Sequence, residues 1–441
     1  MEKKFTRRDF IGLGTAAAAG AFLIGCAGGS KTEVYIPPLL DAAPDGPELK
    51  AGLVGCGGRG TGAAHNFLDA GPNLRIVALA DVFQDRIDGT RQKLKDNKGV
   101  DIPDENIYLG FDAYKRLIDS DVDIVILATP PFFRHMMFEY AVNAKKHVFM
   151  EKPVAVDPVG ARSIMATARK AENLGLQVST GTQRRHKRDY VETFRRVSDG
   201  AIGDITGGNV YWNGGQLWYR EPRPEWSEME YMIRDWVNWT WLSGDHIVEQ
   251  HVHNLDVFYW FTGMTPVSAL GFGSRQRRVT GNQFDNFSID FTYENGMHLH
   301  SMCRQIDGCA RKVAETIRGS KGYAEMDNGG LQKLYDYNGN LIWEYEYPAE
   351  QEEDSRWKVK NPYVQEHTDL VTNIRNNTPL VEAEATAIST MMAIMGRISS
   401  YTGKEVTWDE MMSSDLEIGP RQFALGPVNG ISREVPVPGT A

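Results

Sequence analysis

Residues 49–60 read LKAGLVGCGGRG, an apolar run that leads directly into a glycine-rich turn. The apolar run, residues 49–54, is short, which favours a buried parallel strand over a helix. Residues 63–68, after the turn, read as a helix. Strand, glycine turn and helix in this order form the context in which a GxGxxG pattern binds a dinucleotide. The segment therefore predicts the first unit of a Rossmann domain.

The glycines of this turn have separate physical roles. Gly55 permits the tight turn, Gly57 lets the backbone approach a pyrophosphate, and Gly60 lets the helix pack close to the strand. Gly58 and Arg59 complete the turn at the helix N-terminus, where free N–H groups and the positive end of the helix dipole attract phosphate. We therefore predict that these five residues contact the cofactor.

An acidic residue indicates which dinucleotide the site prefers. The next predicted strand, residues 75–80, ends at Asp81, about 20 positions after the turn, where an acidic side chain binds the adenosine ribose hydroxyls. Its negative charge would repel a 2′-phosphate, so NAD is favoured over NADP. The alternative role for Asp81 is that of a helix N-cap.

Two further buried strands carry polar residues at their carboxyl ends. Residues 123–128 lead into Thr129-Pro130, and residues 147–150 lead into Glu151-Lys152-Pro153. A lysine at the carboxyl end of a strand in a doubly wound sheet points into the ligand crevice. Pro153 disfavours a helical conformation of Lys152. The alternative is a surface lysine that precedes a proline turn.

Residues 244–261 predict an amphipathic helix with a polar edge. Val248, Val252, Leu255 and Tyr259 follow helical spacing and form a stripe that faces the core. One residue later, Glu249, His253, Asp256 and Trp260 repeat that spacing on a neighbouring face. Carboxylates and an imidazole on one edge suit proton transfer to a bound hydroxyl.

Other roles for the histidines of this segment stay open. His246, Glu249, His251 and His253 are candidate ligands of a metal ion. In a regular helix, however, His246 and His251 do not share the face of Glu249 and His253, so we predict no metal site. Structural histidines with satisfied hydrogen bonds are the remaining alternative, and it suits His251 better than His253.

The segment that joins Ala128-Thr129-Pro130 to residues 146–153 resembles the Gfo/Idh/MocA oxidoreductases, and the resemblance covers about residues 48–420. It implies that Lys152 is the catalytic lysine beside the nicotinamide, and that Thr129, Pro130, His135 and Glu151 also contact the cofactor. His253 matches the catalytic histidine of the family. Glu249 stands where the family commonly has aspartate, and His251 where it commonly has glycine, which leaves the shape of the pocket open.

Substrate contacts are predicted outside the catalytic helix as well as on it. Arg184 and Arg185 follow a predicted strand, and either a substrate contact or a solvated basic turn fits them. Six of the ten tryptophans fall within residues 211–241. Aromatic faces stack on sugars, although most of these rings would serve packing. Our substrate candidates are Arg184, Trp236, His253 and Asp256.

The expected fold class is α/β, with a doubly wound parallel Rossmann sheet at residues 48–155. Residues 156–420 should form a second α/β domain with a large, open, mostly antiparallel sheet, as alternating segments such as 286–293 indicate. Residues 31–47 read as a flexible linker, and residues 421–441 as a loop-rich tail.

Residues 1–30 predict an export leader. Arg7 and Arg8 lie in a segment that resembles a twin-arginine signal, and an apolar run too short for a bilayer span follows. Residues 23–26 resemble a lipobox, so Cys26 is a candidate for a lipid anchor; cleavage without lipidation and a soluble, uncleaved start are the alternatives. The expected location is the periplasm, reached by the twin-arginine route.

Composition and charge limit the classes of partner that the protein could bind. The net charge of −10 argues against a nucleic-acid or anionic-membrane surface. Cys303 and Cys309 are either a disulfide pair or two buried thiols. An exposed large sheet would favour a homo-oligomer.

Three functions follow from these observations. The first is an NAD-dependent dehydrogenase of a sugar, glycoside or cyclitol. The second is a redox-neutral enzyme in which NADH is reoxidised in place, as in NAD-dependent glycoside hydrolases, which resemble the chain in its first domain but differ in the catalytic-helix motif. The third, a cofactor-binding sensor, is disfavoured by Lys152 and His253. Export adds a constraint, because free NAD is scarce outside the cytoplasm and the cofactor must then be retained.

Overall fold

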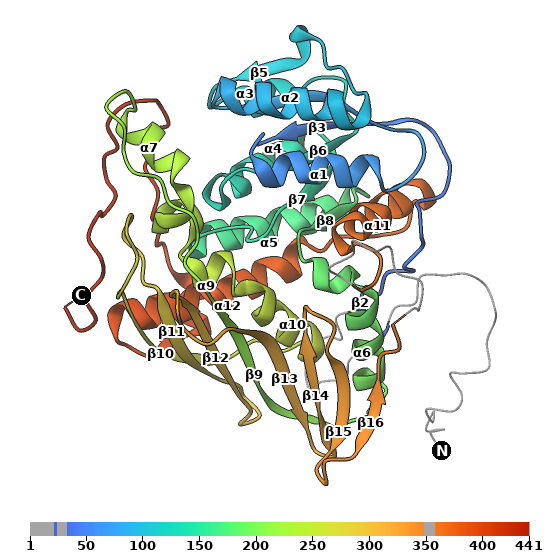
Figure 1. The fold of residues 1–441 in the computed structure, drawn as a ribbon, viewed down its shortest axis with the longest axis vertical. Helices are drawn as coiled ribbons and strands as arrows, with labels where there is room; N and C mark the ends of the chain where they lie inside the picture. The colour runs from blue at the N-terminus through green and yellow to red at the C-terminus, as the bar shows by residue number, and fades with distance from the viewer. Residues whose placement is uncertain (1–21, 24–32, 348–357, 441) are drawn as a thin grey trace.

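The computed structural model describes residues 22–23, 33–347 and 358–440. These residues form two α/β domains, each built on its own sheet, with helices between the sheets (Figure 1). A two-residue strand, β1 (Phe22–Leu23), pairs antiparallel with β2 (Glu33–Val34). Arg7, Arg8 and Cys26 of the predicted leader lie outside the described residues. Among the described residues, no helix has both the length and the apolar character needed to cross a bilayer.

The first sheet is six-stranded, parallel, and ordered β5-β4-β3-β6-β7-β8. Its order reverses between β3 and β6, which makes the crevice beside the glycine turn the topological switch point where such sheets bind ligands. The strands are β3 (Leu49–Val54), β4 (Leu74–Asp81), β5 (Ile107–Leu109), β6 (Ile124–Leu127), β7 (His147–Met150) and β8 (Val178–Thr180).

Five helices connect these strands. They are α1 (Gly58–Leu68), α2 (Gln84–Lys98), α3 (Ala113–Ile118), α4 (Arg134–Asn143) and α5 (Pro158–Asn173). The predicted boundary at residue 155 comes too early, because β8 pairs with β7 as the sixth strand of this sheet. A strand before Arg184 was predicted and is present, but which strand it pairs with depends on contacts with distant parts of the chain.

The second sheet has nine strands in the order β16-β15-β14-β13-β9-β12-β11-β10-β17, and all its pairs are antiparallel except β9 with β12. The prediction of a large, mostly antiparallel sheet is therefore confirmed. The strands are β9 (Ile205–Gly214), β10 (Ser268–Ser274), β11 (Asn286–Thr292), β12 (His298–Gln305), β13 (Lys312–Gly319), β14 (Gly322–Asp327), β15 (Gln332–Asp336), β16 (Leu341–Glu344) and β17 (Val406–Thr407).

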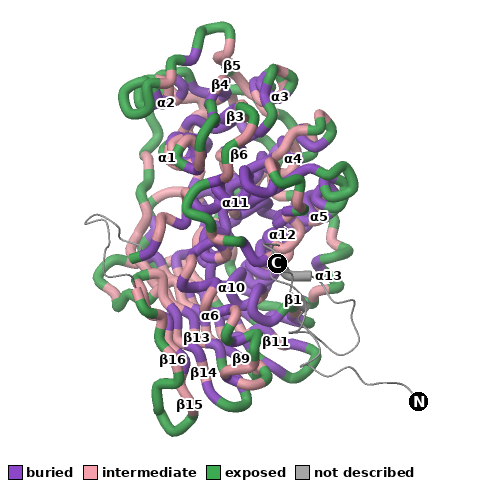
Figure 2. The backbone as a smooth tube through the Cα atoms, turned by 90° about the vertical axis from the view of Figure 1, so that its right-hand side faces the viewer, coloured by how far each residue is buried: buried purple, intermediate pink, exposed green. Residues whose placement is uncertain are grey.

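Helices between the two sheets form the centre of the molecule. Figure 2 shows α10, α11 and α12 as mostly buried. The helices after β8 are α6 (Arg188–Ser198), α7 (Glu228–Arg234), α8 (Thr240–Ser243), α9 (His246–Glu249), α10 (Val252–Thr262), α11 (Pro362–Asn376), α12 (Ala383–Thr402) and α13 (Trp408–Ser413). Helix α11 packs on α1 and α12 packs on α5, so the late part of the chain returns to the first domain.

The predicted flexible linker is instead fixed at several points of its described part, residues 33–47. The Tyr35 hydroxyl accepts a hydrogen bond from Asn373 at 2.7 Å, and Ile36 is buried. The carbonyl of Leu40 accepts hydrogen bonds from Lys360 and Gln365. These contacts hold the segment against α11 and the residues before it.

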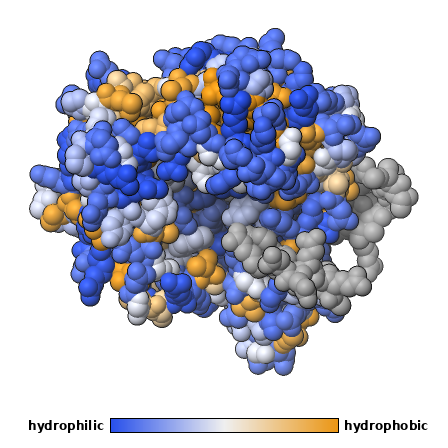
Figure 3. Space-filling model, turned by 45° about the horizontal axis from the view of Figure 1, so that its top comes forward, coloured by the Kyte–Doolittle hydropathy of each residue, from blue (hydrophilic) through white to orange (hydrophobic). Residues whose placement is uncertain are grey.

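Polar residues cover most of the face seen in Figure 3, and apolar side chains gather there in small groups.

Cys56, Cys303 and Cys309 are free thiols, so the alternative of a Cys303–Cys309 disulfide is wrong for this structure.

Candidate active site

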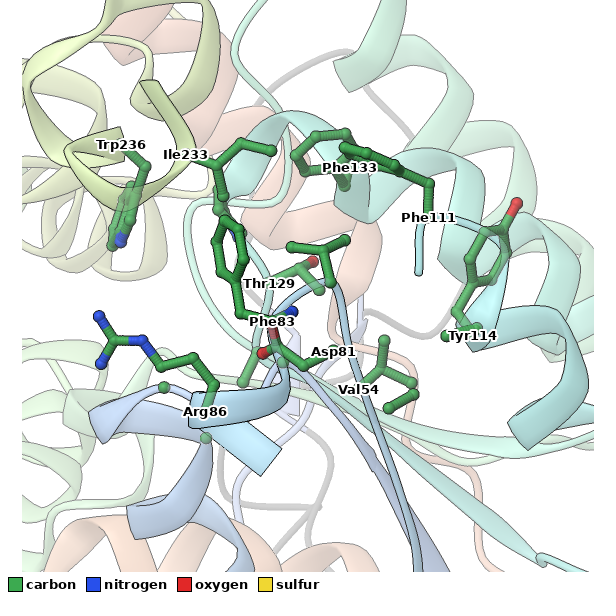
Figure 4. Close-up of a pocket in the computed structure, with 18 of the residues that line it drawn as sticks. Val54, Asp81, Phe83, Arg86, Phe111, Tyr114, Thr129, Phe133, Ile233 and Trp236 are labelled. Atoms are coloured by element: carbon green, nitrogen blue, oxygen red, sulfur yellow. The ribbon is translucent and has the colours of Figure 1, made fainter. Parts of the chain in front are cut away.

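A cavity of about 610 Å³ lies at the carboxyl ends of β3, β4 and β6, a volume within the range of roughly 300–1,000 Å³ usual for small-molecule sites. Residues from both domains line it. Figure 4 shows Asp81 and Thr129, from the first domain, facing Ile233 and Trp236, from the second. Because its wall is shared, the cavity is formed only when the two domains are packed together.

The glycines of the turn match the demands of a dinucleotide. Gly55 has φ +97°, and a Cβ there would lie 2.7 Å from the carbonyl carbon of Ala128. A Cβ on Gly60 would lie 1.8 Å from the Gly55 oxygen, so only glycine lets α1 pack at this distance. Cβ atoms on Gly57 and Gly58 would meet nothing within 4 Å, and both residues line the cavity. This open space at a helix N-terminus fits a pyrophosphate.

Asp81 ends β4 and lines the same cavity. Its carboxylate accepts hydrogen bonds from the backbone N–H of Cys56, at 2.6 Å, and of Phe83, at 3.0 Å. Burial raises the pKa of Asp81 above its ordinary value. A carboxylate has about four lone-pair positions, so these two bonds fix its orientation and leave capacity for ribose hydroxyls. The residues present therefore fit NAD.

Arg59 connects the cofactor cavity to the predicted catalytic lysine. It lines the cavity, and its Nε donates a hydrogen bond to Glu151, the residue before Lys152. Its guanidinium carbon lies 4.6 Å from the centre of the Tyr363 ring, a cation–π contact. Glu366 adds a second carboxylate 3.9 Å from Arg59. The arginine of the glycine turn thus aligns Glu151 and Lys152 with the cofactor site.

Lys152, Glu249 and His253 come together at the domain interface. The Lys152 ammonium donates to the Glu249 carboxylate at 3.0 Å and to the Glu249 backbone carbonyl. His253 stacks on Trp212 of β9, with ring centres 5.5 Å apart and planes 21° apart. These three residues do not line the cofactor cavity but lie beside it. Arg59, which lines the cavity, is bonded to Glu151, and Glu151 precedes Lys152. The predicted catalytic residues are therefore grouped, in a compact site with little solvent.

The protonation state of His253 follows from its surroundings. Burial, and next the positive charge of Lys152, hold the pKa of His253 well below its usual range. The ring is therefore neutral at neutral pH. Among the residues that the structure describes, no side chain forms a hydrogen bond with this ring. A neutral imidazole with an open nitrogen is able to accept a proton from a bound hydroxyl.

Three buried histidines make the stability of the protein depend on pH. Burial lowers the pKa of His251 to about 3, and the pKa values of His253 and His367 also lie well below normal. Below about pH 6.5, the unfolded chain gains protons that the folded chain does not. As the pH falls below about 6.5, the free energy of unfolding should therefore fall by up to about 1.4 kcal/mol per pH unit for each histidine, until the folded protein binds the proton as well.

Denaturant unfolding at several pH values measures this dependence. His251→Asn should remove the contribution of His251 and so reduce the slope by up to about 1.4 kcal/mol per pH unit. An unchanged slope would show that His251 does not titrate differently in the folded and unfolded states.

Residues 244–261 differ from the single helix that the periodicity predicted. Helix α9 ends at Glu249 and α10 begins at Val252, with a turn at Gln250 and His251 between them. His251 Nε2 lies 2.7 Å from Ser301 Oγ, and this hydrogen bond to β12 holds the turn. Val248, Val252 and Leu255 of the predicted core stripe are nonetheless buried, because the turn keeps both helices on the same core, and Tyr259, its fourth member, is half-buried.

The histidines that suggested a metal site have other partners. His246 Nδ1 lies 3.0 Å from the Asp245 carboxylate, and His251 bonds to Ser301. In the described parts of the chain, no group of three or more His, Cys, Asp or Glu side chains is arranged to hold a metal ion.

Two predicted substrate residues are held in buried ion pairs. Arg184 is 1% exposed and donates to Glu315. Both oxygens of Asp256 accept from Arg185, at 2.8 and 2.9 Å, and Ser389 donates to one of them. These contacts place Arg184 and Asp256 in the framework between α10, η3 (Gln183–His186) and the second sheet. The polar edge of α10 therefore serves packing at Asp256, whereas its His253 ring lies near the charge of Lys152.

Trp236 lies in the wall of the cavity, whereas His135, a predicted cofactor contact, lies outside it. Trp236 lines the cofactor cavity, beside Trp218, with ring centres 6.2 Å apart. His135 packs edge-on against Phe132 and is absent from the cavity lining, since α4 turns it toward α5. Thr129 and Pro130, the other predicted cofactor contacts of this loop, line the cavity.

Sequence reasoning missed Arg134, which ties the loops of the site together. This buried arginine donates hydrogen bonds to three backbone carbonyls: Thr129 at 2.6 Å, Glu151 at 3.0 Å and Pro153 at 2.6 Å. Burial lowers its pKa to about 10. A lone arginine at the start of a helix carries no sequence signal for this role.

Comparisons with known proteins support the same fold. The sequence model of an oxidoreductase family with an NAD-binding Rossmann fold matches residues 49–180. The model of the GFO/IDH/MocA C-terminal domain matches residues 190–325. Together the two matches span more than half of the chain.

Curated relatives have low identity. A glycosyl hydrolase family 109 protein of Shewanella sp. (strain ANA-3) is 28% identical over 213 residues, 47% of this chain and 45% of that protein. The chain thus matches about half the length of this relative. An inositol 2-dehydrogenase of Salmonella typhimurium is 25% identical over 301 residues, 67% of this chain and 79% of that protein.

A solved structure shows the likeness of fold. Scyllo-inositol dehydrogenase from Lactobacillus casei, with bound cofactor NAD(H) and scyllo-inositol, has a TM-score of 0.61 to this chain at 21% identity. The match covers 82% of this chain and 99% of that one.

Proposed function

Because this chain belongs to the GFO/IDH/MocA oxidoreductase family, with its NAD-binding Rossmann domain, we propose that it oxidises a carbinol of a sugar, glycoside or cyclitol with tightly held NAD. The observation that carries this proposal is the grouping of Lys152, Glu249 and His253 beside the cofactor cavity. An ammonium group, Lys152, close to a neutral imidazole, His253, suits the removal of a proton from a bound hydroxyl.

Lys152, Glu249 and His253 have separate roles in the proton transfer. NAD, when bound, supplies the hydride acceptor. His253 accepts the hydroxyl proton, because its ring is neutral. The Lys152 ammonium, oriented by Glu249, donates a hydrogen bond to the same substrate oxygen and stabilises its developing negative charge. Arg59 and Arg134 bind Glu151 and the Thr129 loop, and these bonds keep Lys152 next to the cofactor site.

A redox-neutral glycoside hydrolase is the second candidate. The name of the Shewanella relative, a glycosyl hydrolase family 109 protein, supports it. In such an enzyme the cofactor is reduced and reoxidised within one catalytic cycle, so no second nucleotide is consumed. The same proton-transfer residues serve both candidates, and the fate of the reduced cofactor separates them.

One experiment tests the proposal and separates the candidates. The protein is purified without added nucleotide, and any bound nucleotide is released and identified. The purified protein is then offered inositols, free sugars and glycosides while NADH absorbance and released sugar are followed. A dehydrogenase accumulates NADH, whereas the redox-neutral enzyme releases sugar with no net NADH. If no carbinol substrate is converted, with or without added NAD, the proposal is wrong.

We also propose that the protein is exported by the twin-arginine route and works in the periplasm, with Cys26 as its lipid anchor. Arg7-Arg8 and the lipobox-like residues 23–26 support this. Mass spectrometry of the mature N-terminus tests it. A start at a lipidated Cys26 is expected, and an unprocessed Met1 in the cytoplasmic fraction would contradict export.

We propose a homo-oligomer as well. Two large apolar side chains of β10, Leu270 and Phe272, are 44% and 72% exposed on the outer face of the second sheet. Pairing of two such faces would bury them. Light scattering is expected to give a mass of at least two chains, and a monomer at high concentration would contradict this.

A further inference from the structure

The C-terminal tail, residues 414–440, runs back to the cofactor cavity. After α13 ends at Ser413, the described part of the tail has neither helix nor strand. Figure 1 shows it running beside α7 before it reaches the C-terminus. Phe423 of this tail is one of the residues that line the cavity. The tail that the sequence suggested was a loop-rich appendage is therefore part of the cavity wall.

Both domains anchor the tail. On the first domain, the Ile418 N–H donates to Asp157 at 3.2 Å, and Gly419 lies so close to Phe132 that a Cβ there would clash with its ring at 1.9 Å. On the second domain, the Val428 N–H donates to Glu228 at 2.8 Å. Phe423 lies between these two anchors in the sequence, so its position over the cavity is fixed from both sides.

Further bonds hold the rest of the tail to the second domain. Met229 N–H donates to the Gly426 carbonyl at 3.0 Å, and Asn282 donates to the Ser432 carbonyl at 3.0 Å. Near the end of the chain, the Gly439 N–H donates to Thr402 at 3.0 Å. Moving the tail away from the cavity would therefore break several bonds at once.

Phe423 belongs to an aromatic cluster around the cavity. Its ring centre lies 5.4 Å from that of Phe133 and 6.3 Å from that of Phe111, with which it stacks. Phe111 follows β5, next to the strand that ends at Asp81, so it marks the adenosine half of the crevice. Phe133 follows the Thr129-Pro130 loop. Phe423 thus spans the two loops of the first domain between which a dinucleotide would lie.

We propose that Phe423 is a cofactor-binding residue and that the tail slows release of the dinucleotide. This inference rests on the proposed function, in which NAD stays on the protein. The ring covers apolar surface over the crevice, and the anchors on both domains keep it there. A dinucleotide leaving on this side must displace Phe423, and this displacement must break its aromatic contacts.

The test is the dissociation rate of NADH from the full-length protein. NADH fluorescence is followed after a chase with excess NAD, in wild type, Phe423→Ala and Leu425→Ala. Leu425 is the matched control, because it lies in the same tail, is 54% exposed and does not line the cavity. Release should be about tenfold faster in Phe423→Ala, which corresponds to about 1.4 kcal/mol, and unchanged in Leu425→Ala.

Equal rates in wild type and Phe423→Ala would overturn the inference. If Phe423→Ala does not fold, Phe423→Leu keeps apolar bulk without the stacked ring and should still release NADH faster than wild type. A wild-type rate in Phe423→Leu would then overturn the inference. Failure of wild type to bind NADH at all would contradict the proposed function itself, whereas a bound cofactor that leaves Phe423→Ala at the wild-type rate would remove only the role of the tail.

Discussion

Lys152→Met is expected to lower turnover by about 10²–10⁴-fold while NAD remains bound. The substitution keeps a side chain of similar length but removes the ammonium that pairs with Glu249 at 3.0 Å. Without that cation, the substrate oxygen loses a donor as its negative charge develops. The glycine turn and Asp81, which fit the dinucleotide, are untouched. The loss should therefore fall on kcat, measured together with bound nucleotide per protein.

Two variants make this result specific. His253→Asn removes the proposed proton acceptor and should be impaired to a similar degree. Lys95→Met removes a lysine that is 57% exposed and pairs with Asp101 on the surface, so its activity should equal that of wild type. Wild-type activity in both Lys152→Met and His253→Asn would show that the chemistry takes place elsewhere.

Two alanine substitutions in the glycine turn should have opposite consequences for folding and for binding. In Gly57→Ala the new Cβ meets no protein atom within 4 Å, so the melting temperature should match wild type. The same methyl group enters the space that fits the pyrophosphate, so NAD affinity should fall by about 100-fold or more. Calorimetry gives the first quantity and nucleotide titration gives the second.

Gly60→Ala should instead fail at folding. Its Cβ would lie 1.8 Å from the Gly55 oxygen, and backbone on both sides of that contact has to move. Overpacking of this kind costs about 1–3 kcal/mol, and occasionally more. Gly62→Ala, whose Cβ would lie 3.3 Å from the flexible end of Arg59, serves as the tolerated control in α1. Normal stability in Gly60→Ala, or normal NAD binding in Gly57→Ala, would contradict this account of the turn.

Local signals in the sequence predicted the first domain well. Gly60 and Asp81 are constrained by contacts with Gly55 and Cys56 of the same motif, so their spacing alone reports their roles. The Glu151-Lys152 pair likewise follows a strand whose end can be predicted. The same reasoning failed where the deciding partner is distant in sequence. β8 joins the first sheet, and Asp256 pairs with Arg185, through contacts that no local pattern encodes.

The break between α9 and α10 shows the same limit. The apolar period continues through Gln250 and His251, so it predicts one helix. The turn is set by the bond from His251 to Ser301, on a strand about fifty residues later. Phe423 was missed for a related reason, because a tail without periodicity gives no sign of the domain that it contacts.

The most direct test of hydride transfer at this site is a single-turnover measurement. NAD-loaded protein is mixed with the carbohydrate that the substrate panel identifies, and NADH absorbance is followed within the first cycle. NADH should form on the protein, more slowly when the carbinol carbon bears deuterium, and hardly at all in Lys152→Met. Conversion of the carbohydrate with no NADH signal in the first cycle and no deuterium effect would contradict the account.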